Sequence, residues 1–453
     1  MILSQPLPRG KRFFRPTGLR GATLALLLRL VAAFVHHQRR MSASQAASLL
    51  RCQARHRAAL TRFLAQAGWA KDWAVLARVA DLLLQQEARR DGTWLFILDQ
   101  THVGQQGAKT ENTFSRGNYR KRPKKGNRKN KSRAKRSCHC FVCGLLLTPS
   151  GLRIPCCRSY YTEAYCLSRG QKYRKQTELA AELIDALAVP PEARVVVLGD
   201  TAFEAKDIRA ACGRRQFLWV VPINPERVLA GPKPRPKVAS LAKELSAEHF
   251  RAVRLVPGQG PFAAQRRVAR CRLGPKVKAP TFYVHPERRA VHNVGDVLLV
   301  FSTKDKPQPG QGVRVQKVLM TNAVGLSVAK VVELYDLRWQ IELFFKECKG
   351  TLGLHQYRCR QFVKAENWVQ GCLVAFCYLE WYRAGKLRRR GLSAQGKRWW
   401  SWQRSHGLCQ AVRQEVEEAD LGQLQRGVKT KAGLRRLRRL LRAARPLEER
   451  EVA

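Results

Sequence analysis

Two short apolar runs, each followed by an aspartate, constrain the fold of this chain more than any other feature. Residues Trp94–Leu98 and Val195–Gly199 read as strands covered on both faces, and each is predicted to stop at its aspartate, Asp99 or Asp200. Because parallel strands bring their carboxyl ends to one edge of an open α/β sheet, the two carboxylates are expected to lie close together. Aspartates also cap turns and helices, so this pair alone does not identify a site.

The pattern around these runs predicts a mixed α/β sheet. Further strands are expected at 139–148, 152–161 and 217–221, and helices at 172–187 and 206–212. From 224 to 326 short β patterns with Gly and Pro take over. Helical periodicity returns at 327–352 and 361–383. The stretch 224–326 is therefore expected to interrupt an α/β unit.

The charge of the chain indicates a polyanionic partner. Its 453 residues include 85 Lys and Arg against 33 Asp and Glu, a net charge of +52. Such a surface repels itself unless a polyanion neutralises it, and the usual polyanion is nucleic acid. A basic drift in composition would not explain so large a ratio. Residues 116–136 hold twelve Lys or Arg and no acid, which fits a solvated loop or a loop that grips phosphates equally well.

Cysteine content and hydropathy favour a cytoplasmic protein. Fourteen cysteines are too few for a disulfide scaffold in a chain of this length. No apolar run reaches the roughly 20 residues of a membrane span, and Arg29 interrupts the best candidate, Ala22–Val35. Export is therefore not expected.

A group of cysteines superficially resembles a zinc site. The motif is Cys138-His139-Cys140-x2-Cys143, together with Cys156 and Cys157. Side chains from His139 to Cys143 would alternate along the predicted strand and point toward opposite faces, so buried thiols are favoured over a metal site.

The predicted helix at 327–352 places a carboxylate among residues that bind phosphate. At about 100° per residue, Tyr335, Arg338, Glu342, Lys346 and Lys349 share one face. The opposite face carries the apolar residues Leu337, Ile341, Phe344 and Cys348. An ordinary amphipathic helix with a solvated face would have the same polarity. An amphipathic helix alone does not explain why a glutamate on that face is flanked by Tyr, Arg and Lys.

Metal-assisted phosphoryl transfer supplies such a reason. Mg²⁺ prefers carboxylate oxygens and leaves positions open for water and phosphate. Three carboxylates can hold two metal ions about 4 Å apart, which clamp the attacking and leaving oxygens. Arg338 offers a planar fork for phosphate and Lys349 a point charge. Tyr335 can donate to a phosphate oxygen or stack on a base.

At these residues the sequence resembles the DDE transposases of bacterial insertion sequences, in particular the cut-and-paste family numbered four. The signature Y-x2-R-x3-E-x6-K is met without a gap by Tyr335, Arg338, Glu342 and Lys349. The segments Leu98–Thr101 and Gly199–Phe203 are similar to the two aspartate strands of that family. The resemblance covers roughly residues 94–383.

This resemblance implies an RNase H-like core interrupted by a β-rich insertion. It implies Mg²⁺, with Mn²⁺ as a substitute, held by Asp99, Asp200 and Glu342. The residues implied to bind terminal phosphates are Tyr335, Arg338 and Lys349, to which Lys346 is added from the same helix face. The implied reaction is nicking at transposon ends, often with a hairpin intermediate, and then attack of a 3′-hydroxyl on target DNA. A homodimer that joins two ends in a nucleoid-associated complex is also implied.

Five regions follow from the pattern and the resemblance together. They are a helical DNA-binding region (1–92), the first part of the catalytic core (93–223), the β-rich insertion (224–326), the second part of the core with the Glu helix (327–385), and a basic helical C-terminal region (386–453).

The sequence departs from the family pattern in two places. Gln100 stands where a small hydroxyl residue is frequent, and the insertion contains no tryptophan, since Trp219 lies just before it. Relatives that form hairpins can use an aromatic residue there to hold a flipped base. Phe282 and Tyr283 are the candidates for that role here.

Three other functions are consistent with parts of the sequence. A repurposed transposase would bind DNA without cutting it. A structure-specific RNase H-like nuclease would cut branched DNA without joining ends. A basic packaging or ribosome-associated protein would explain the charge, but it would need neither aspartate strand nor the polar helix face.

Overall fold

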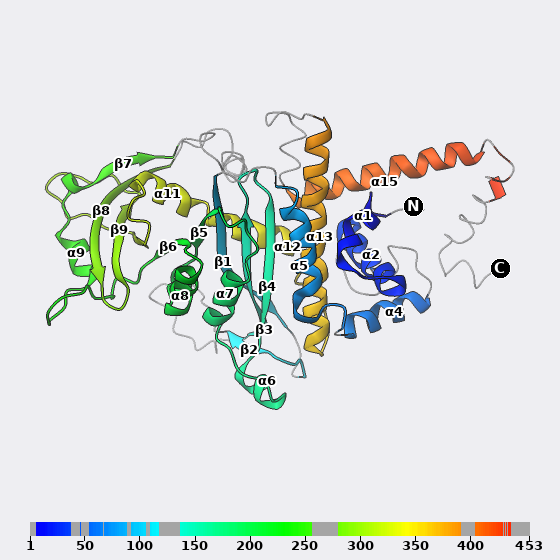
Figure 1. Cartoon of the computed structure of the whole chain (residues 1–453), viewed down its shortest axis with the longest axis horizontal. Helices are drawn as coiled ribbons and strands as arrows, with labels where there is room; N and C mark the ends of the chain where they lie inside the picture. Colours follow the sequence, from blue (N-terminus) through cyan, green and yellow to red (C-terminus); the bar gives the residue numbers. More distant parts are fainter. Residues whose placement is uncertain are drawn as a thin grey trace, which may run out of the picture. The chain divides into compact units, whose positions relative to one another are not determined.

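The computed structural model of the chain is shown in Figure 1. It describes residues 6–37, 46, 54–66, 68–87, 92–105, 109–116, 136–255, 280–390, 404–428, 430, 432 and 434–435. The chain divides into two compact units. The first comprises Met1–Leu82, Ala108–Glu111 and Lys346–Ala453, and the second comprises Leu83–Gly107 and Asn112–Phe345. Most of the basic segment 116–136 lies outside the described residues.

A ten-stranded mixed sheet forms the second unit. Its order is β2-β3-β1-β5-β6-β10-β9-β8-β7, with β4 also paired to β3. The strands are β1 (Thr93–Gly104), β2 (Phe114–Arg116), β3 (Arg136–Leu147), β4 (Arg153–Tyr160), β5 (Arg194–Leu198), β6 (Leu218–Pro222), β7 (Arg251–Arg254), β8 (Thr281–Val291), β9 (Gly295–Thr303) and β10 (Lys317–Thr321). The pairs β1–β5 and β5–β6 are parallel, and the other pairs are antiparallel. The predicted mixed α/β fold is confirmed.

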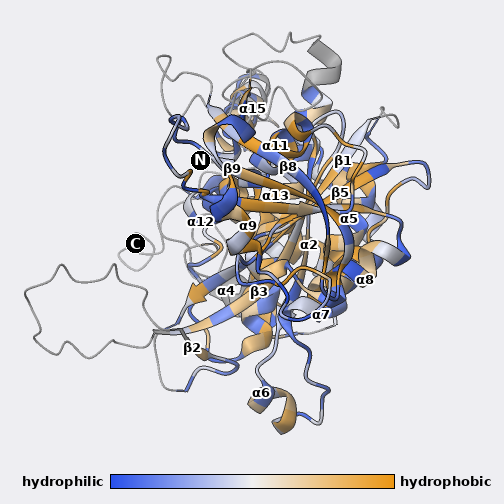
Figure 2. Ribbon diagram, turned by 90° about the vertical axis from the view of Figure 1, so that its left-hand side faces the viewer, coloured by the Kyte–Doolittle hydropathy of each residue, from blue (hydrophilic) through white to orange (hydrophobic). Residues whose placement is uncertain are grey.

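Buried apolar side chains explain why these segments become central strands. Every residue from Trp94 to Leu98 and from Val195 to Leu198 is buried, as expected of strands covered on both faces. The core strands and helix α13 (Phe362–Arg390) carry the hydrophobic colour in Figure 2.

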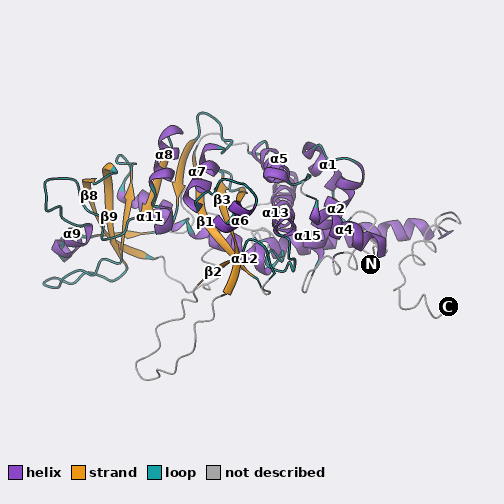
Figure 3. Ribbon diagram, turned by 90° about the horizontal axis from the view of Figure 1, so that it is seen from below, coloured by secondary structure: helices purple, strands orange, loops and turns teal. Residues whose placement is uncertain are grey.

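The helices of the second unit include the crossovers of the parallel strands. They are α6 (Glu163–Ser168), α7 (Gln176–Asp185), α8 (Lys206–Arg214), α9 (Val238–Glu244), α11 (Val328–Asp336) and the first part of α12 (Trp339–Gly350). Helix α8 connects β5 to β6, and α7 packs on α8, β3 and β4. In Figure 3, α9 lies beside β8 and β9.

The strands of the β-rich stretch belong to the same sheet as the core. Strand β10 pairs with β9 on one side and with β6 on the other. The stretch 224–326 therefore continues the sheet through β10.

Helices make up the first unit. They are α1 (Gly10–Phe14), α2 (Gly21–His36), α4 (Ala54–Ala65), most of α5 (Ala74–Leu84), α13 and α15 (Ser405–Val428). Helix α13 packs against α2, α4 and α15. None of the helices among the described residues has the length and apolar character needed to cross a membrane.

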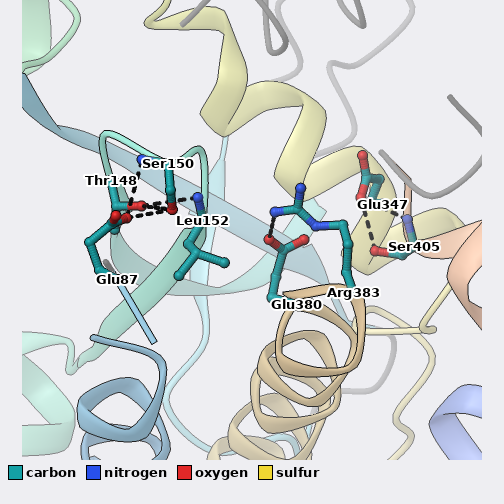
Figure 4. A network of polar contacts seen from close by, with 8 residues as sticks. All are labelled: Glu87, Thr148, Ser150, Leu152, Glu347, Glu380, Arg383 and Ser405. Atoms are coloured by element: carbon teal, nitrogen blue, oxygen red, sulfur yellow. Dashed lines mark hydrogen bonds and ion pairs between the residues drawn. The ribbon is translucent and has the colours of Figure 1, made fainter. Parts of the chain in front are cut away.

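Buried polar side chains join the helices of the first unit. The Asn367 amide of α13 donates to the carbonyls of Leu64 and Gln66, both at 2.9 Å. The Glu347 carboxylate accepts from the backbone N–H of Ser405 at 3.1 Å and from its hydroxyl at 2.9 Å (Figure 4). Each bond satisfies a buried polar group that would otherwise destabilise the fold.

A turn formed by Pro149–Gly151 joins β3 to β4. The Gly151 N–H donates to the Thr148 carbonyl at 2.8 Å, and the Thr148 hydroxyl accepts from the Leu152 N–H at 3.0 Å. The Ser150 hydroxyl also donates to Glu87 at 2.5 Å (Figure 4).

Two sequence-based predictions of element bounds are wrong. Strand β1 does not stop at Asp99 but continues to Gly104, because β3 pairs with it along its whole second half. The helix predicted at 327–352 is two helices, α11 and α12, which meet at Leu337 and Arg338. There the N–H groups of Leu337 and Arg338 donate to carbonyls three residues earlier, which tightens the chain and interrupts the α-helical pattern.

The β1–β3 pair depends on a glycine at position 144. Gly144 lies opposite Leu98, and a Cβ there would overlap the Phe96 ring and approach Cys156 Sγ to 2.8 Å. Gly144→Ala should therefore lower the free energy of unfolding by about 1–3 kcal/mol through overpacking. Gly104→Ala is the matched control, because a Cβ in that strand position meets nothing within 4 Å.

Differential scanning calorimetry checks this prediction. The melting temperature should fall by roughly 2–4 °C for each kcal/mol lost in Gly144→Ala and should stay near that of the wild type in Gly104→Ala. Equal melting temperatures for the two variants would show that the Phe96 ring relaxes without cost.

Candidate active site

The parallel pairing of β1 with β5 brings the two predicted aspartates to one edge of the sheet. The register runs from Thr93 opposite Arg194 to Ile97 opposite Leu198. Asp99 and Asp200 each lie two residues beyond that last pair. The two strands are parallel neighbours, which is the condition under which the sequence places the two aspartates at one edge.

The backbone holds each aspartate in a different way. Asp99 sits within β1, opposite Cys143 of β3, and its Oδ1 accepts from the Gln100 N–H at 2.7 Å. Asp200 caps the short 3₁₀ helix Thr201–Phe203, with its Oδ1 accepting from the Ala202 N–H at 2.9 Å. The capping role considered for Asp200 from the sequence is therefore real, and it fixes this carboxylate at the end of β5.

A buried glutamate ties the turn after Asp200 to neighbouring segments. Glu204, whose side chain is 5% exposed, pairs with Arg209 of α8 and, at 2.8 Å, with Arg227 from the start of the β-rich stretch. Two guanidinium groups on one carboxylate satisfy its buried oxygens. The turn that carries Asp200 is thus held on both sides.

Arg338 links two of the three predicted carboxylates. Its Nη2 lies 2.5 Å from Glu342 Oε1, and its Nη1 lies 3.7 Å from Asp99 Oδ2. The break between α11 and α12 places Arg338 immediately before the first turn of α12, where Glu342 is found. One guanidinium therefore faces carboxylates from the sheet and from the helix.

Electrostatics connects the third carboxylate to the same group. Burial raises the pKa of Asp99 to about 6, the Gln100 N–H and Arg338 oppose this rise, and the charges of Asp200 and Glu342 add to it. Asp200 and Glu342 therefore each lie within electrostatic range of Asp99. Perturbed carboxyl groups of this kind are typical of functional sites.

Tyr335 completes this cluster from the last turn of α11. Burial raises the pKa of its hydroxyl to about 12, a hydrogen bond and charge interaction with Arg338 act against the rise, and Asp200 and Glu342 reinforce it. The hydroxyl therefore stays protonated at neutral pH and is available as a donor beside the carboxylates.

The chemical type of these side chains suits a hard divalent cation. All three acidic groups offer oxygen ligands, and Asp99 and Glu342 already converge on one cationic group, the Arg338 guanidinium. Within the described part of the chain, no three His, Cys, Asp or Glu side chains stand close enough together to form a ready-made metal cluster.

The remaining residues of the predicted site lie further along α12. Lys346 and Lys349 follow Glu342 by about one and two helical turns and belong to the first compact unit. Their role as phosphate-binding residues stays a prediction from the sequence motif. The same is true of a base-holding role for Phe282 and Tyr283, which lie half-buried on β8.

The cysteines that resembled a zinc site lie in the β3–β4 pair. Cys143 is directly opposite Cys157, with the two sulfur atoms 3.5 Å apart, and Cys156 donates to the Gly144 carbonyl at 3.6 Å. Burial raises the pKa of the Cys156 thiol to about 12, so this group is a protonated thiol packed in the sheet.

Sequence reasoning missed one residue beside the cluster, Lys317 at the start of β10. Its ammonium lies 4.9 Å from the centre of the Tyr335 ring. A lysine eighteen residues before the tyrosine gives no periodic signal, so only the folded sheet places it there.

The pKa of Asp99 predicts a stabilising substitution. A carboxyl group whose pKa rises from about 3.9 in the unfolded chain to about 6 destabilises the fold when ionised, by up to about 3 kcal/mol. Asp99→Asn removes this charge and keeps an oxygen for the Gln100 N–H. The variant should melt at a higher temperature than the wild type at pH 7.5, and the difference should shrink as the pH falls from 6 toward 4.

Melting curves between pH 4 and pH 8 test this expectation, with Asp296→Asn as the matched control because that carboxylate is exposed in the same unit. A melting temperature for Asp99→Asn below that of the wild type at pH 7.5 would contradict the conclusion that ionised Asp99 destabilises the fold.

A comparison with models of protein families finds a match over most of the chain. The family described as "Transposase DDE domain" matches residues 90–378, which include both aspartate strands, Tyr335, Arg338 and Glu342. A comparison with individual curated proteins finds no significant match. The family match spans more than half of the chain, so this protein belongs to the family of transposases with a DDE domain.

Proposed function

We propose that this protein is a Mg²⁺-dependent, cut-and-paste DNA transposase of the insertion-sequence family with the Y-x2-R-x3-E-x6-K signature, and that its core is RNase H-like. The observation that carries the proposal is the convergence of Asp99 and Glu342 on Arg338, with Asp200 and Tyr335 in electrostatic range. The proposed reaction is cleavage at transposon ends followed by transfer of the cut strand into target DNA.

Asp99, Asp200 and Glu342 are the residues that would hold the metal. When bound, Mg²⁺ or Mn²⁺ would stabilise the attacking and leaving oxygens of the phosphoryl transfer. The protein's contribution is to bury one carboxylate, Asp99, near two others, which raises the pKa of Asp99 through burial and then through their repulsion. Positive charge at this point relieves their repulsion.

Arg338 and Tyr335 would position the scissile phosphate. The Arg338 side chain is only 15% exposed, so its charge acts with less screening than that of a surface arginine. Its planar fork can turn from carboxylate to phosphate oxygens, which have similar geometry. Tyr335 adds a neutral donor, and Lys346 and Lys349 are proposed to bind phosphates further along the DNA.

The regions outside the sheet would bind the transposon ends. The helical region 1–92 is proposed as a DNA-binding region, the stretch 224–326 as the insertion between the two parts of the core (93–223 and 327–385), and the basic region 386–453 as a further DNA contact. The net charge of +52 supports extensive phosphate contact. Synapsis of two ends would require a homodimer, acting at the nucleoid in the cytoplasm.

Neutral variants of the three carboxylates test the proposal. Asp99→Asn, Asp200→Asn and Glu342→Gln should each lower cleavage and strand transfer of a DNA fragment from the element's boundary by at least about 10³-fold, because each removes a ligand of the metal ion that would act on the reacting phosphate. Binding of the same DNA in a gel-shift assay should persist. Asp296→Asn, an exposed aspartate in the same unit, is the matched control and should cleave as the wild type does.

Cleavage should also require Mg²⁺ or Mn²⁺ and stop on chelation. A fully active variant with all three carboxylates neutralised would disprove the mechanism. Cleavage of branched DNA without joining would instead indicate a structure-specific nuclease, and binding without cleavage by the wild type would indicate a repurposed DNA-binding protein.

A further inference from the structure

The end of β9 and the start of β10 lie side by side and bring two lysines together. Lys317 begins β10 opposite Ser302 of β9, and Lys304 directly follows the end of β9. The Gln316 side chain connects the two segments, since its Oε1 accepts from the Lys304 N–H at 3.2 Å and its Nε2 donates to Asp305 at 2.8 Å. The backbone positions of both lysines are thus fixed relative to each other.

Each ammonium group lies over an aromatic ring. Lys317 Nζ is 4.9 Å from the centre of the Tyr335 ring, and Lys304 Nζ is 5.7 Å from that of Phe282. A ring face attracts a cation without neutralising it. The rings therefore hold the ammonium groups in place and leave their N–H donors available.

The charges around these lysines favour an anion. Burial lowers the pKa of Lys317, and the like charges of Arg338 and Lys304 lower it further. The charge of Glu342 acts in the opposite direction. Asp305, next to Lys304, is engaged by Gln316. Among the residues that the structure describes, neither lysine has a carboxylate within ion-pair distance.

We infer that Lys304 and Lys317 form a phosphate-binding pair, which holds the backbone of the DNA strand where it runs from the carboxylates toward β8. This inference rests on the proposed function and extends its binding site beyond the residues of the sequence motif. DNA fits because its phosphates are successive anions. Of the charged side chains that act on Lys317 in the described part of the chain, Arg338 and Lys304 are positive and Glu342 is negative.

The salt dependence of DNA binding tests the pair. Lys317→Ala and Lys304→Ala should each reduce the slope of log K against log salt by about 0.9 and weaken binding about eight-fold at 0.1 M salt, the effect of one lost phosphate contact. Lys317→Arg should retain the slope of the wild type, because it keeps the charge. Lys243→Ala is the matched control, since this exposed lysine lies on α9, beside the far end of β8.

The assay uses the full chain and a boundary DNA fragment, and melting curves confirm that each variant folds. Slopes for Lys317→Ala and Lys304→Ala equal to that for Lys243→Ala would overturn the inference, even if the wild type cleaves this DNA in Mg²⁺. Failure of the wild type to cleave, or cleavage that survives Asp99→Asn, would instead overturn the proposed function. The two failures are therefore distinguishable.

Discussion

The burial of one carboxylate, Asp99, beside two other acidic groups is the constraint on which this site depends. Asp99, Asp200 and Glu342 come from a strand, the turn after a strand and a helix. Burial raises the pKa of Asp99, and repulsion from the other two carboxylates adds to the rise, so ionised Asp99 works against folding. Arg338 offsets part of that repulsion by pairing with Asp99 and Glu342. A protein keeps such an arrangement when the strain serves a cation or a phosphate at the site.

The surrounding fold supplies the rigidity that this strain requires. The apolar strands β1 and β5 are buried along the stretch that precedes each aspartate, and Gly144 leaves room for the Phe96 ring against β3. Glu204 joins the turn after Asp200 to two arginines. The carboxylates therefore sit on backbone that is packed and hydrogen-bonded, where small displacements are costly.

The sequence allowed prediction of the features that depend on local pattern. The runs Trp94–Leu98 and Val195–Gly199 identified the central strands, and their common direction brought Asp99 and Asp200 to one edge. Continuation of β1 to Gly104 could not be foreseen, because it depends on pairing with β3, whose partner residues lie about 35–50 positions away. The helix break at Leu337 and Arg338 could not be predicted either, since apolar periodicity continues across it. Lys317 reaches Tyr335 only through tertiary structure.

The hydrogen bonding of β10 has a mechanical consequence. Because β10 pairs with β6 and β9, and β6 with β5, an uninterrupted row of backbone bonds runs from β8 to β5, which ends two residues before Asp200. A force exerted on β8 by a bound strand of DNA would reach that aspartate through a stiff lattice. The β-rich segment should then be mechanically coupled to the core, so that deforming it would alter the spacing of the acidic groups.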